Sequence, residues 1–302
     1  MLTMVNNSNT MEGVLLGNEP LARYTSWRVG GAAEYFYKPS GIADLQNYLG
    51  GLASSENVVW LGLGSNVLIR DGGVRGSVIY TRGCLSRIKF TSSDELYVEA
   101  GVPCAHVAKQ TVEKGLTGAE FLAGIPGTMG GALTMNAGAF NGEVWDLVSS
   151  VVVINKNGEL ITRRAEEFEV AYRTVNLNEG EWFVSATLKI PKGSDQQGKE
   201  RIRQLLAKRS ETQPTNLPSG GSVFKNPEGD YAARLIEACG LKGYQIGSAQ
   251  VSEKHANFIV NKGGATANQI EELIAHVRCE VLGKQGVSLQ TEVRIIGEAL
   301  IK

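Results

Sequence analysis

The sequence predicts an α+β fold in which a strand-rich first part precedes a smaller mixed unit. Short apolar runs bounded by turn residues indicate strands, and amphipathic stretches with helical spacing lie among them. A chain of 302 residues has the length of about two domains. The composition becomes more polar and charged after Pro191, which predicts a boundary between the two parts within 195–218.

The first part contains both helical and strand patterns. Helices are expected where apolar residues recur at helical spacing, over 42–54 and 103–114. Strands are expected at short runs rich in branched and aromatic residues, at 58–61, 67–69, 78–80, 96–99, 151–154 and 184–190.

The sequence predicts fewer strands in the second part of the chain. The expected elements are a charged helix over 196–210, a polar connector over 211–221, a helix over 231–239, a strand over 258–260 and an amphipathic helix over 267–282. The last segment, 287–295, alternates apolar and polar residues, which predicts a strand with Glu292 in its middle and Arg294 on the same face.

The charge balance and the apolar runs exclude several classes of protein. Lys and Arg number 30 against 31 Asp and Glu, with no basic stripe, so we expect no nucleic-acid partner. The longest apolar runs, such as 151–154, are too short to span a membrane. No basic residue precedes Arg23, and we therefore expect no secretory signal.

The cysteines are widely spaced and form no CxxC motif. This spacing argues against a zinc site or a disulfide framework and favours free, buried thiols in a reducing compartment. We expect a soluble cytoplasmic protein that holds no metal. The cysteines are Cys84, Cys104, Cys239 and Cys279.

Glycine is in excess, with 37 residues, roughly 16 more than a chain of average composition would carry. One group lies in Gly62-Leu63-Gly64-Ser65-Asn66-Val67 and begins like the dinucleotide fingerprint GxGxxG. Val67 stands in place of the third glycine, and Leu68 continues as strand, so this is not a Rossmann site. The loop is either an ordinary tight turn or a nest of backbone N–H groups for a phosphate.

A denser group of glycines lies within 118–142. Its centre, 123–139, consists almost entirely of small residues, with Thr128 and Asn136 as polar groups. Such a segment is poorly suited to ordinary strand or helix packing. Close approach of the backbone to a flat ligand or a pyrophosphate explains it better, so we favour a cofactor site. No GxxxxGK[ST] motif occurs, which excludes a P-loop nucleotide hydrolase.

The segment 220–227 (GGSVFKNP) brings a hydroxyl, an ammonium and an amide group together. It is either a loop that grips a substrate or a turn between domains. It is not the GxSxG motif of serine hydrolases, because Phe224 replaces the second glycine. Arg173 and Glu292 can each be read as an ordinary surface residue. Structural roles are expected for the histidines, which are His106, His255 and His276.

Taken together, six stretches strongly resemble the UDP-N-acetylenolpyruvoylglucosamine reductase (MurB) family, in order over essentially the whole chain. The segments GSxFKNP and EVRxIG are specific to this family, and the earlier ones also fit the wider group of FAD-binding proteins with a flavin domain of the vanillyl-alcohol-oxidase type. The stretches are YTSWRVGG (24–31), LGLGSNVLIRDGG (61–73), GLTGAEFLAGIPGTMGGALTMNAGAFNGE (115–143), AYR (171–173), TQPTNLPSGGSVFKNP (212–227) and EVRIIG (292–297).

The resemblance implies a two-lobed FAD-binding domain of the vanillyl-alcohol-oxidase (PCMH) type, about 27–192, followed by a smaller α+β substrate domain. The implied divisions are 1–84 for the first lobe, with 293–302 returning to it, 85–205 for the second lobe and 206–292 for the substrate domain.

The implied activity is reduction of the enolpyruvyl ether of UDP-N-acetylglucosamine to UDP-N-acetylmuramate, a peptidoglycan precursor, which would connect the protein with cell wall biogenesis, cell shape, cell cycle and cell division. NADPH would reduce the flavin, and hydride would then pass from reduced FAD to C3 of the enolpyruvyl group. FAD is expected to be non-covalent, because 61–73 and 115–143 lack the His or Cys to which relatives attach it. A monomer is expected.

The resemblance also implies roles for individual residues. Arg173, Ser222 and Glu292 would be catalytic: Ser222 would give a proton to C2, while Arg173 and protonated Glu292 would stabilise the negative charge that builds there. Tyr172, Lys225 and Asn226 would bind the substrate. The expected cofactor-binding residues are Gly62, Gly64, Ser65, Asn66, Val67, Leu68, Gly124, Ile125, Pro126, Gly127, Thr128, Gly130, Gly131, Asn136, Ala137 and Gly138.

Two features refine the resemblance. The short connection from Arg173 to the strand at 184–190 resembles the subtype that lacks an extra tyrosine-bearing loop over the substrate. Val175 departs from the family, which often has Ser or Thr at that place. Whether one local hydrogen bond forms there is therefore left open. Two rival functions remain: a flavin oxidase of the same domain family that acts on an alcohol, and a sugar-nucleotide-binding regulator without flavin.

Overall fold

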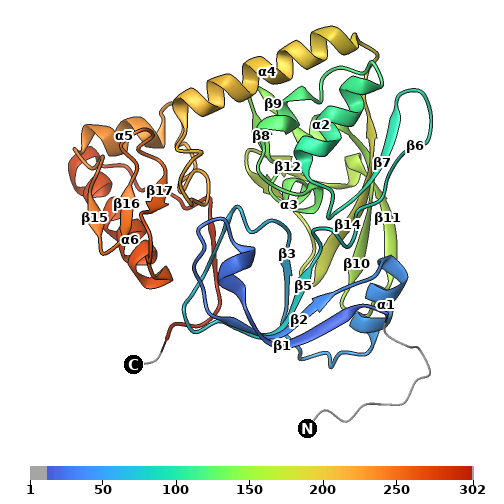
Figure 1. Cartoon of the computed structure of the whole chain (residues 1–302), viewed down its shortest axis with the longest axis horizontal. Coiled ribbons are helices and arrows are strands. Elements are labelled where there is room, and N and C mark those ends of the chain that lie inside the picture. Colours follow the sequence, from blue (N-terminus) through green and yellow to red (C-terminus); the bar gives the residue numbers. More distant parts are fainter. Residues whose placement is uncertain (1–11, 301–302) are drawn as a thin grey trace. The chain divides into compact units, whose positions relative to one another are not determined.

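The computed structural model describes residues 12–300 and consists of two compact units (Figure 1). Unit 1 comprises the described residues up to Gly17 together with Tyr35–Gly62 and Gly76–Leu205. Unit 2 comprises Asn18–Glu34, Leu63–Arg75 and the described residues from Leu206 onward. The expectation of no secretory signal falls partly on residues 1–11, and the predicted returning segment ends with 301–302; both stretches lie outside the described residues.

The larger sheet of unit 1 is antiparallel, with the strand order β11-β10-β14-β7-β6. The longest pairing joins β10 and β14, from Val148 opposite Leu188 to Asn155 opposite Glu181. The strands are β6 (Ile88–Phe90), β7 (Glu95–Glu99), β10 (Val148–Asn155), β11 (Leu160–Arg164) and β14 (Glu181–Lys189).

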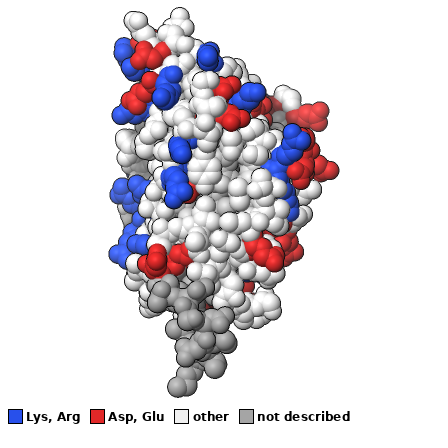
Figure 2. Space-filling model, turned by 90° about the vertical axis from the view of Figure 1, so that its right-hand side faces the viewer, with Lys and Arg blue, Asp and Glu red and all other residues white. Residues whose placement is uncertain are grey.

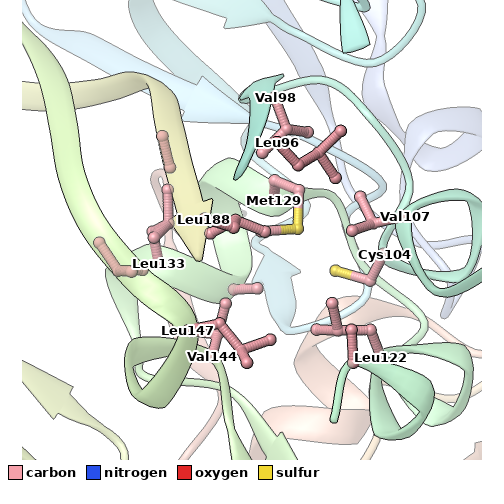
Figure 3. Close-up of a cluster of buried hydrophobic side chains, with 14 of the residues drawn as sticks. Leu96, Val98, Cys104, Val107, Leu122, Met129, Leu133, Val144, Leu147 and Leu188 are labelled. Carbon is pink, nitrogen blue, oxygen red and sulfur yellow. The ribbon is translucent and has the colours of Figure 1, made fainter. Parts of the chain in front are cut away.

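The core of unit 1 packs this sheet against short helices. These are α2 (Cys104–Glu113), the 3-10 helix η2 (Glu120–Gly124) and α3 (Met129–Thr134). Burial of one such apolar side chain contributes about 1.5–3 kcal/mol, so Met129 and Leu133 anchor the glycine-rich segment to the core. Figure 3 shows the side chains that point toward one another there: Leu96, Val98, Cys104, Val107, Leu122, Met129, Leu133, Val144, Leu147 and Leu188.

A second sheet has the strand order β1-β2-β5-β3. In unit 1, helix α1 (Ile42–Gly50) is fixed by a pair of stacked rings, Tyr37 and Tyr48, whose centroids lie 3.8 Å apart. The Tyr37 hydroxyl also donates a 2.6 Å hydrogen bond to the buried carboxylate of Asp44. The strands are β1 (Val14–Pro20), β2 (Ala32–Lys38), β3 (Val58–Leu61) and β5 (Val74–Tyr80).

Unit 2 contains the antiparallel sheet β15-β16-β17 and two helices. Its longest helix begins at a capping box, in which the Gln269 N–H donates to Thr266 Oγ1 at 3.1 Å, and ends before Gly286, whose φ is +70°. The elements are β15 (Gln245–Ile246), β16 (Ala249–Val251), β17 (Ile259–Asn261), α5 (Ala232–Ala238) and α6 (Ala267–Gln285). The predicted apolar face of α6 is buried in the core of unit 2: Ile270, Leu273, Ile274, Val277 and Val281.

The last strand of unit 2, β18 (Arg294–Ile296), pairs in parallel with β4 (Val67–Ile69). Arg70, which follows β4, binds the Glu271 carboxylate of α6 through Nε at 2.9 Å and Nη2 at 2.8 Å. The guanidinium stabilises the ionised carboxylate and thereby lowers the pKa of Glu271. The C-terminal strand and α6 are therefore both tied to the segment Leu63–Arg75, while the predicted lobe and domain divisions stay predictions.

The remaining elements complete the chain. Helix α4 (Asp195–Thr212) is the predicted charged helix, and it buries only Gly198 and Leu205. The others are short: β8 (Gly138–Ala139) paired with β9 (Gly142–Glu143), β12 (Val170–Ala171) paired with β13 (Thr174–Val175), and the 3-10 helices η1 (Leu21–Tyr24), η3 (Val144–Leu147) and η4 (Ala165–Glu167).

The helices and strands predicted from the sequence are confirmed in type, but several differ in extent. The strands expected at 78–80 and 151–154 are longer in the structure, as β5 and β10. The helix expected over 42–54 ends at Gly50, where two successive glycines disfavour helix. The strand expected over 287–295 is formed only from Arg294 onward, so Glu292 precedes the strand and does not lie in its middle. The alternation is real, because Leu289 and Val293 are buried, but the parallel partner β4 is only three residues long.

Surface charge, helix hydropathy and metal-ligating side chains bear on the classes of protein that the sequence argued against. On the face shown in Figure 2, Lys and Arg lie in small groups among Asp and Glu. Within residues 12–300, no helix is long and apolar enough to cross a membrane, and no His, Cys, Asp and Glu side chains cluster as metal ligands.

All four cysteines are free thiols. The expected burial is confirmed for Cys104 and Cys239, and burial raises the pKa of the Cys104 thiol to about 12. It is wrong for Cys279, which is exposed because it lies off the apolar face of α6, and Cys84 is only half-buried.

Candidate active site

The loop that joins β3 to β4 is shaped by close packing within unit 2. Gly64 has φ +62°, and a Cβ at this position would lie 2.2 Å from the carbonyl oxygen of Tyr24. The Gly64 carbonyl accepts hydrogen bonds from the Ser26 N–H at 3.0 Å and from Ser26 Oγ at 3.2 Å. Glycine is therefore required here by the protein's own packing, whether or not a phosphate binds to the loop.

Two glycines set the path of the chain into Ser222, which is half-buried. A Cβ at Gly220 would lie 2.4 Å from the ring of Trp27, which is completely buried. Gly221 has φ +76°, a conformation that side chains with a Cβ rarely adopt, although a Cβ there would make only an ordinary contact, 3.8 Å from the Ser65 carbonyl oxygen. One glycine thus permits a close approach and the other permits the turn.

The segment after Ser222 is held by a residue that the sequence analysis did not single out, Asn257. Its side chain pairs with both main-chain groups of Phe224: the Phe224 N–H donates to Oδ1 at 3.0 Å, and Nδ2 donates to the Phe224 carbonyl at 2.8 Å. The Val223 N–H donates to the Asn257 carbonyl at 2.9 Å. Asn257 is 3% exposed and Phe224 is 1% exposed, so these hydrogen bonds are shielded from water.

Glu292 lies against the same segment through its main chain. Its N–H donates to the Val223 carbonyl at 2.8 Å, and its own carbonyl accepts a hydrogen bond from Asn66 Nδ2 at 3.2 Å. The Arg294 N–H in turn donates to the Asn66 carbonyl at 3.0 Å. Within unit 2, the structure thus brings together three predicted site elements: the Ser222 segment, Glu292 and the Gly64-Ser65-Asn66 loop.

The predicted substrate-binding residues that follow Ser222 differ in their surroundings. Lys225 is half-buried, and its N–H donates to the Gln290 carbonyl at 2.9 Å. Asn226 is exposed, and its Oδ1 accepts a hydrogen bond from the Ala232 N–H at the start of α5, at 3.1 Å. The side-chain oxygen of Asn226 is thus used within the local fold. A substrate contact by Asn226 stays a prediction, and it would use the side-chain nitrogen Nδ2.

In unit 1, Arg173 occupies the turn of the β12–β13 hairpin with φ +53°, in the left-handed region. Its guanidinium donates to two main-chain carbonyls, Asn136 at 3.3 Å and Gly138 at 2.8 Å, and lies 5.1 Å from the centre of the Tyr172 ring. A non-glycine residue in this region costs on the order of 1–3 kcal/mol, and such strained residues gather at functional sites. Arg173 is therefore fixed against the predicted segment 123–139, and the exposed Tyr172 ring lies beside its guanidinium.

Asn136 organises this part of unit 1. It is 1% exposed and has φ +44°. Its Nδ2 donates to Glu143 at 2.7 Å and to the Ala171 carbonyl at 3.3 Å, and its Oδ1 accepts from the Trp145 N–H at 3.3 Å. The side chain is thus used within the protein, and a direct contact of Asn136 with a cofactor stays a prediction.

The glycines of the segment 123–139 fall into two groups. A Cβ at Gly124 would lie 2.8 Å from the Phe140 ring, and one at Gly130 would lie 2.8 Å from the Ala100 Cβ. Gly131, by contrast, is exposed, and a Cβ there would meet nothing closer than Thr128 Oγ1 at 4.0 Å. Internal packing therefore explains part of the glycine excess, and open backbone that a ligand could approach is found at Gly131.

The residues present fit an FAD molecule. In unit 1, the exposed backbone of Gly131 allows the close approach that a flat ring needs. In unit 2, the half-buried Ser65 carries a hydroxyl that can donate to a pyrophosphate. The other predicted cofactor residues are less accessible: the side chains of Leu68, Thr128 and Ala137 are buried, and Gly62 is packed, since its Cβ would lie 2.4 Å from Thr128 Oγ1. The remaining residues of that prediction, Ile125, Pro126, Gly127 and Val67, are half-buried or exposed.

The histidines make contacts of a structural kind. His276 stacks on Tyr244 with ring centroids 4.3 Å apart, and His255 meets the Phe258 ring edge-on at 4.9 Å. Burial lowers the pKa of His255, which favours the neutral ring. His106 pairs with Gln110 along the exposed side of α2 at 3.0 Å.

Comparisons with known proteins identify the family of the chain. Residues 33–163 match the FAD binding domain family, and residues 213–296 match the C-terminal domain of UDP-N-acetylenolpyruvoylglucosamine reductase. The chain is 59% identical to the UDP-N-acetylenolpyruvoylglucosamine reductase of Methylococcus capsulatus over 95% of this chain and 94% of that protein. It is 53% identical to the enzyme of the same name from Legionella pneumophila strain Lens, over 100% and 99% of the two chains.

A solved structure extends the comparison to the fold. The crystal structure of UDP-N-acetylenolpyruvylglucosamine reductase from Thermus caldophilus matches with a TM-score of 0.82 and 31% identity, over 95% of this chain and 100% of that one. The similarity thus covers both the FAD-binding and the C-terminal parts. The chain therefore belongs to the UDP-N-acetylenolpyruvoylglucosamine reductases, FAD-dependent oxidoreductases of peptidoglycan precursor synthesis.

Proposed function

We propose that this chain reduces the enolpyruvyl ether of UDP-N-acetylglucosamine to UDP-N-acetylmuramate, with NADPH as the source of hydride and non-covalently bound FAD. The names of the relatives at 59% and 53% identity support the substrate. The observation that carries the proposal is the hydrogen-bonded cluster of unit 2, in which the Ser222 segment, Glu292 and Asn66 are linked through main-chain groups. These hydrogen bonds fix the main chain beside the serine and the carboxylate to which the proposal gives the chemistry.

Two predicted segments would hold the cofactor. The loop Gly64-Ser65-Asn66 would receive the pyrophosphate, and the segment 123–139 would line the ring system. Bound FAD supplies hydride chemistry that no protein side chain can perform. The chain's own residues then have to bind and orient the sugar nucleotide, stabilise charge and deliver a proton.

Ser222 would supply the proton. Addition of hydride at C3 leaves an electron pair at C2, which spreads into the adjacent carboxylate. The Oγ–H bond of Ser222 would break as the new C2–H bond forms, and the resulting alkoxide would recover its proton from water. A serine hydroxyl is a weak acid, so it suits a strongly basic carbon centre, and general acid catalysis of this kind contributes about 10²–10⁴-fold.

Arg173 and Glu292 would stabilise the developing negative charge. A guanidinium and a protonated carboxyl would lower the barrier because they would interact with charge that appears only in the transition state. Tyr172, Lys225 and Asn226 would bind the substrate. β14 begins at Glu181, which leaves a short connection after Arg173 and supports the subtype without the extra tyrosine loop.

We further propose that the protein acts as a monomer in the cytoplasm. Light scattering of the purified protein, with and without FAD, tests the oligomeric state, and a dimer would overturn that part of the proposal. Fractionation of cells tests the compartment.

The two half-reactions test the activity. NADPH should bleach the flavin absorbance, and the enolpyruvyl sugar nucleotide should restore it without oxygen. An oxidase would instead be reoxidised rapidly by oxygen, and a regulator would carry no flavin absorbance at all.

Substitution tests the role of the serine. Ser222→Ala should retain reduction by NADPH and slow the second half-reaction by about 10²–10⁴-fold. Ser288→Ala, at an exposed serine of the same unit, is the matched control and should change neither. Equal damage to both half-reactions by Ser222→Ala would mean that Ser222 has a structural role.

A further inference from the structure

Asn257 is a buried polar residue that has no role in the proposed mechanism. On one side, the segment after Ser222 pairs like an antiparallel strand with 290–292: Phe224 forms a bridge with Thr291, and the Lys225 N–H donates to the Gln290 carbonyl. On the other side, the carboxamide of Asn257 binds the N–H and the carbonyl of Phe224. The amide therefore takes the place of a neighbouring strand.

This arrangement fixes the main chain next to Ser222 from two directions. The Val223 N–H donates to the Asn257 carbonyl, and the Val223 carbonyl accepts from the Glu292 N–H. Val223 and Phe224 are each 1% exposed, so water cannot replace a lost partner without opening the core. A buried main-chain group left without a partner carries the cost of its lost hydration, which favours displacement of the segment.

We propose that Asn257 is a positioning residue for proton transfer: it holds the Val223–Phe224 main chain against Glu292, so that Ser222 and Glu292 keep one separation. This rests on the proposed function, in which Ser222 gives its proton to C2. A displacement of about 1 Å at a reacting group can lower the rate about 10²-fold. The reduction of flavin by NADPH needs no proton from Ser222 and should not depend on Asn257.

The substitution Asn257→Asp tests this through pH. A protonated carboxyl offers one acceptor and one O–H donor and can replace both hydrogen bonds of the carboxamide, whereas a carboxylate only accepts and would face the Phe224 carbonyl. Burial raises the pKa of such a carboxyl. The second half-reaction of Asn257→Asp should therefore be about 10–100-fold slower than wild type at alkaline pH and recover as the pH falls.

The wild-type rate measured at each pH is the reference, because the neighbouring groups titrate in both proteins. The titratable side chains on the segments that contain or contact Asn257 are Lys225, Glu292, Glu253, Lys254 and His255. The ratio of variant to wild-type rate leaves only the effect of the introduced carboxyl. Amide hydrogen exchange of a peptide over 222–226 supplies a readout apart from activity, because loss of the partner at Oδ1 should speed exchange of the Phe224 N–H.

Two further variants keep the proposal testable if the aspartate variant folds poorly. Asn257→Ser removes both side-chain hydrogen bonds, and its second half-reaction should be slow at every pH. Asn261→Asp is the matched control: Asn261 is also buried, but its Nδ2 donates to the Trp27 carbonyl at 2.9 Å. It should lower the Tm without a pH-reversible loss in the second half-reaction.

Several outcomes would overturn the positioning role. They are an unchanged second half-reaction despite faster Phe224 exchange, equal slowing of both half-reactions, failure of acid to restore Asn257→Asp, and the same acid-reversible loss in Asn261→Asp. Failure of the proposed function is distinguishable, because Ser222→Ala would then keep the second half-reaction whatever Asn257→Asp does.

Discussion

The main-chain N–H of Glu292 donates a hydrogen bond to the carbonyl oxygen of Val223 at 2.8 Å. The bond fixes the Glu292 backbone beside the residue that follows Ser222, independently of the Glu292 side chain. Substitution of the Glu292 side chain therefore leaves the link between the two segments in place. Functional effects of such a change can be assigned to the carboxyl group itself.

Glu292→Gln should reduce turnover and leave the fold intact. Glutamine retains the main-chain hydrogen bond and the side-chain size, but its amide N–H is a weaker donor to the developing charge than a carboxyl O–H. We expect kcat to fall by up to about 10²–10³-fold, the loss that follows complete removal of a transition-state donor, with unchanged reduction by NADPH. Stopped-flow absorbance measures both steps, and the FAD content and Tm serve as controls. Turnover near that of wild type would remove Glu292 from the catalytic residues.

Arg173→Lys should show that the geometry of the guanidinium matters as well as its charge. Arg173 donates to the Asn136 and Gly138 carbonyls through different nitrogens, and one ammonium cannot reproduce both directions. The second half-reaction should slow by about 10²-fold. Arg163→Lys is the matched control, since Arg163 pairs with Glu181 at 2.6 Å in unit 1. Equal loss in both variants would argue against a special role of Arg173.

Adjacent glycines of α3 should respond in opposite ways to alanine. Gly130→Ala places a Cβ 2.8 Å from Ala100, and overpacking of this kind costs about 1–3 kcal/mol in the free energy of unfolding. Gly131→Ala meets open space and should stabilise the apoprotein by up to about 1 kcal/mol through helix propensity. Because Gly131 is a proposed FAD contact, the same change should weaken FAD binding.

Denaturant unfolding of the apoprotein and fluorescence titration with FAD measure these two effects separately. Wild-type FAD affinity in Gly131→Ala would remove Gly131 from the cofactor site. A stable Gly130→Ala apoprotein would show that α3 can shift away from Ala100.

Local patterns predicted the long elements because their apolar spacing is strong. Helix α6 carries five buried apolar residues on one face, and β10 and β14 are apolar runs within the sheet of unit 1. The exposed hairpin β12–β13 was not predicted, because strands of two residues have no periodicity to detect. β1 and β2 were also missed.

The site residues were predicted from motifs, whereas their supports were not. Asn257 binds Phe224 across 33 residues of sequence, and Arg173 binds Gly138 across 35. No local pattern reports such a contact. For the glycines, the sequence suggested more ligand contact than the structure supports. It suggested ligand contact throughout 118–142, but close packing against Phe140 and Ala100 already requires glycine at Gly124 and Gly130. A small residue is needed wherever backbone comes close to any group, protein or ligand.

The ion pair of Arg70 and Glu271 should make the stability of unit 2 depend on pH. The pKa of the Glu271 carboxyl is lowered in the folded protein, chiefly by its hydrogen bond to Arg70. A carboxyl whose folded pKa is depressed contributes stability above its unfolded pKa and loses it as the pH falls through the folded value. The side chains are 38% and 32% exposed, so solvent screening limits the coupling to roughly 1 kcal/mol or less.

A double-mutant cycle with Arg70→Gln and Glu271→Gln isolates this coupling from other effects. Denaturant unfolding near pH 7 should give a positive coupling free energy, and the same cycle at about pH 3 should give a smaller one. The loss begins below the unfolded pKa of about 4.3 and continues as the pH falls through the lower folded value. A coupling of equal size at both pH values would show that the two side chains interact through packing and not through charge. Loss of FAD from either single variant near pH 7 would further indicate that β4 holds the adjacent Gly64-Ser65-Asn66 loop in its binding conformation.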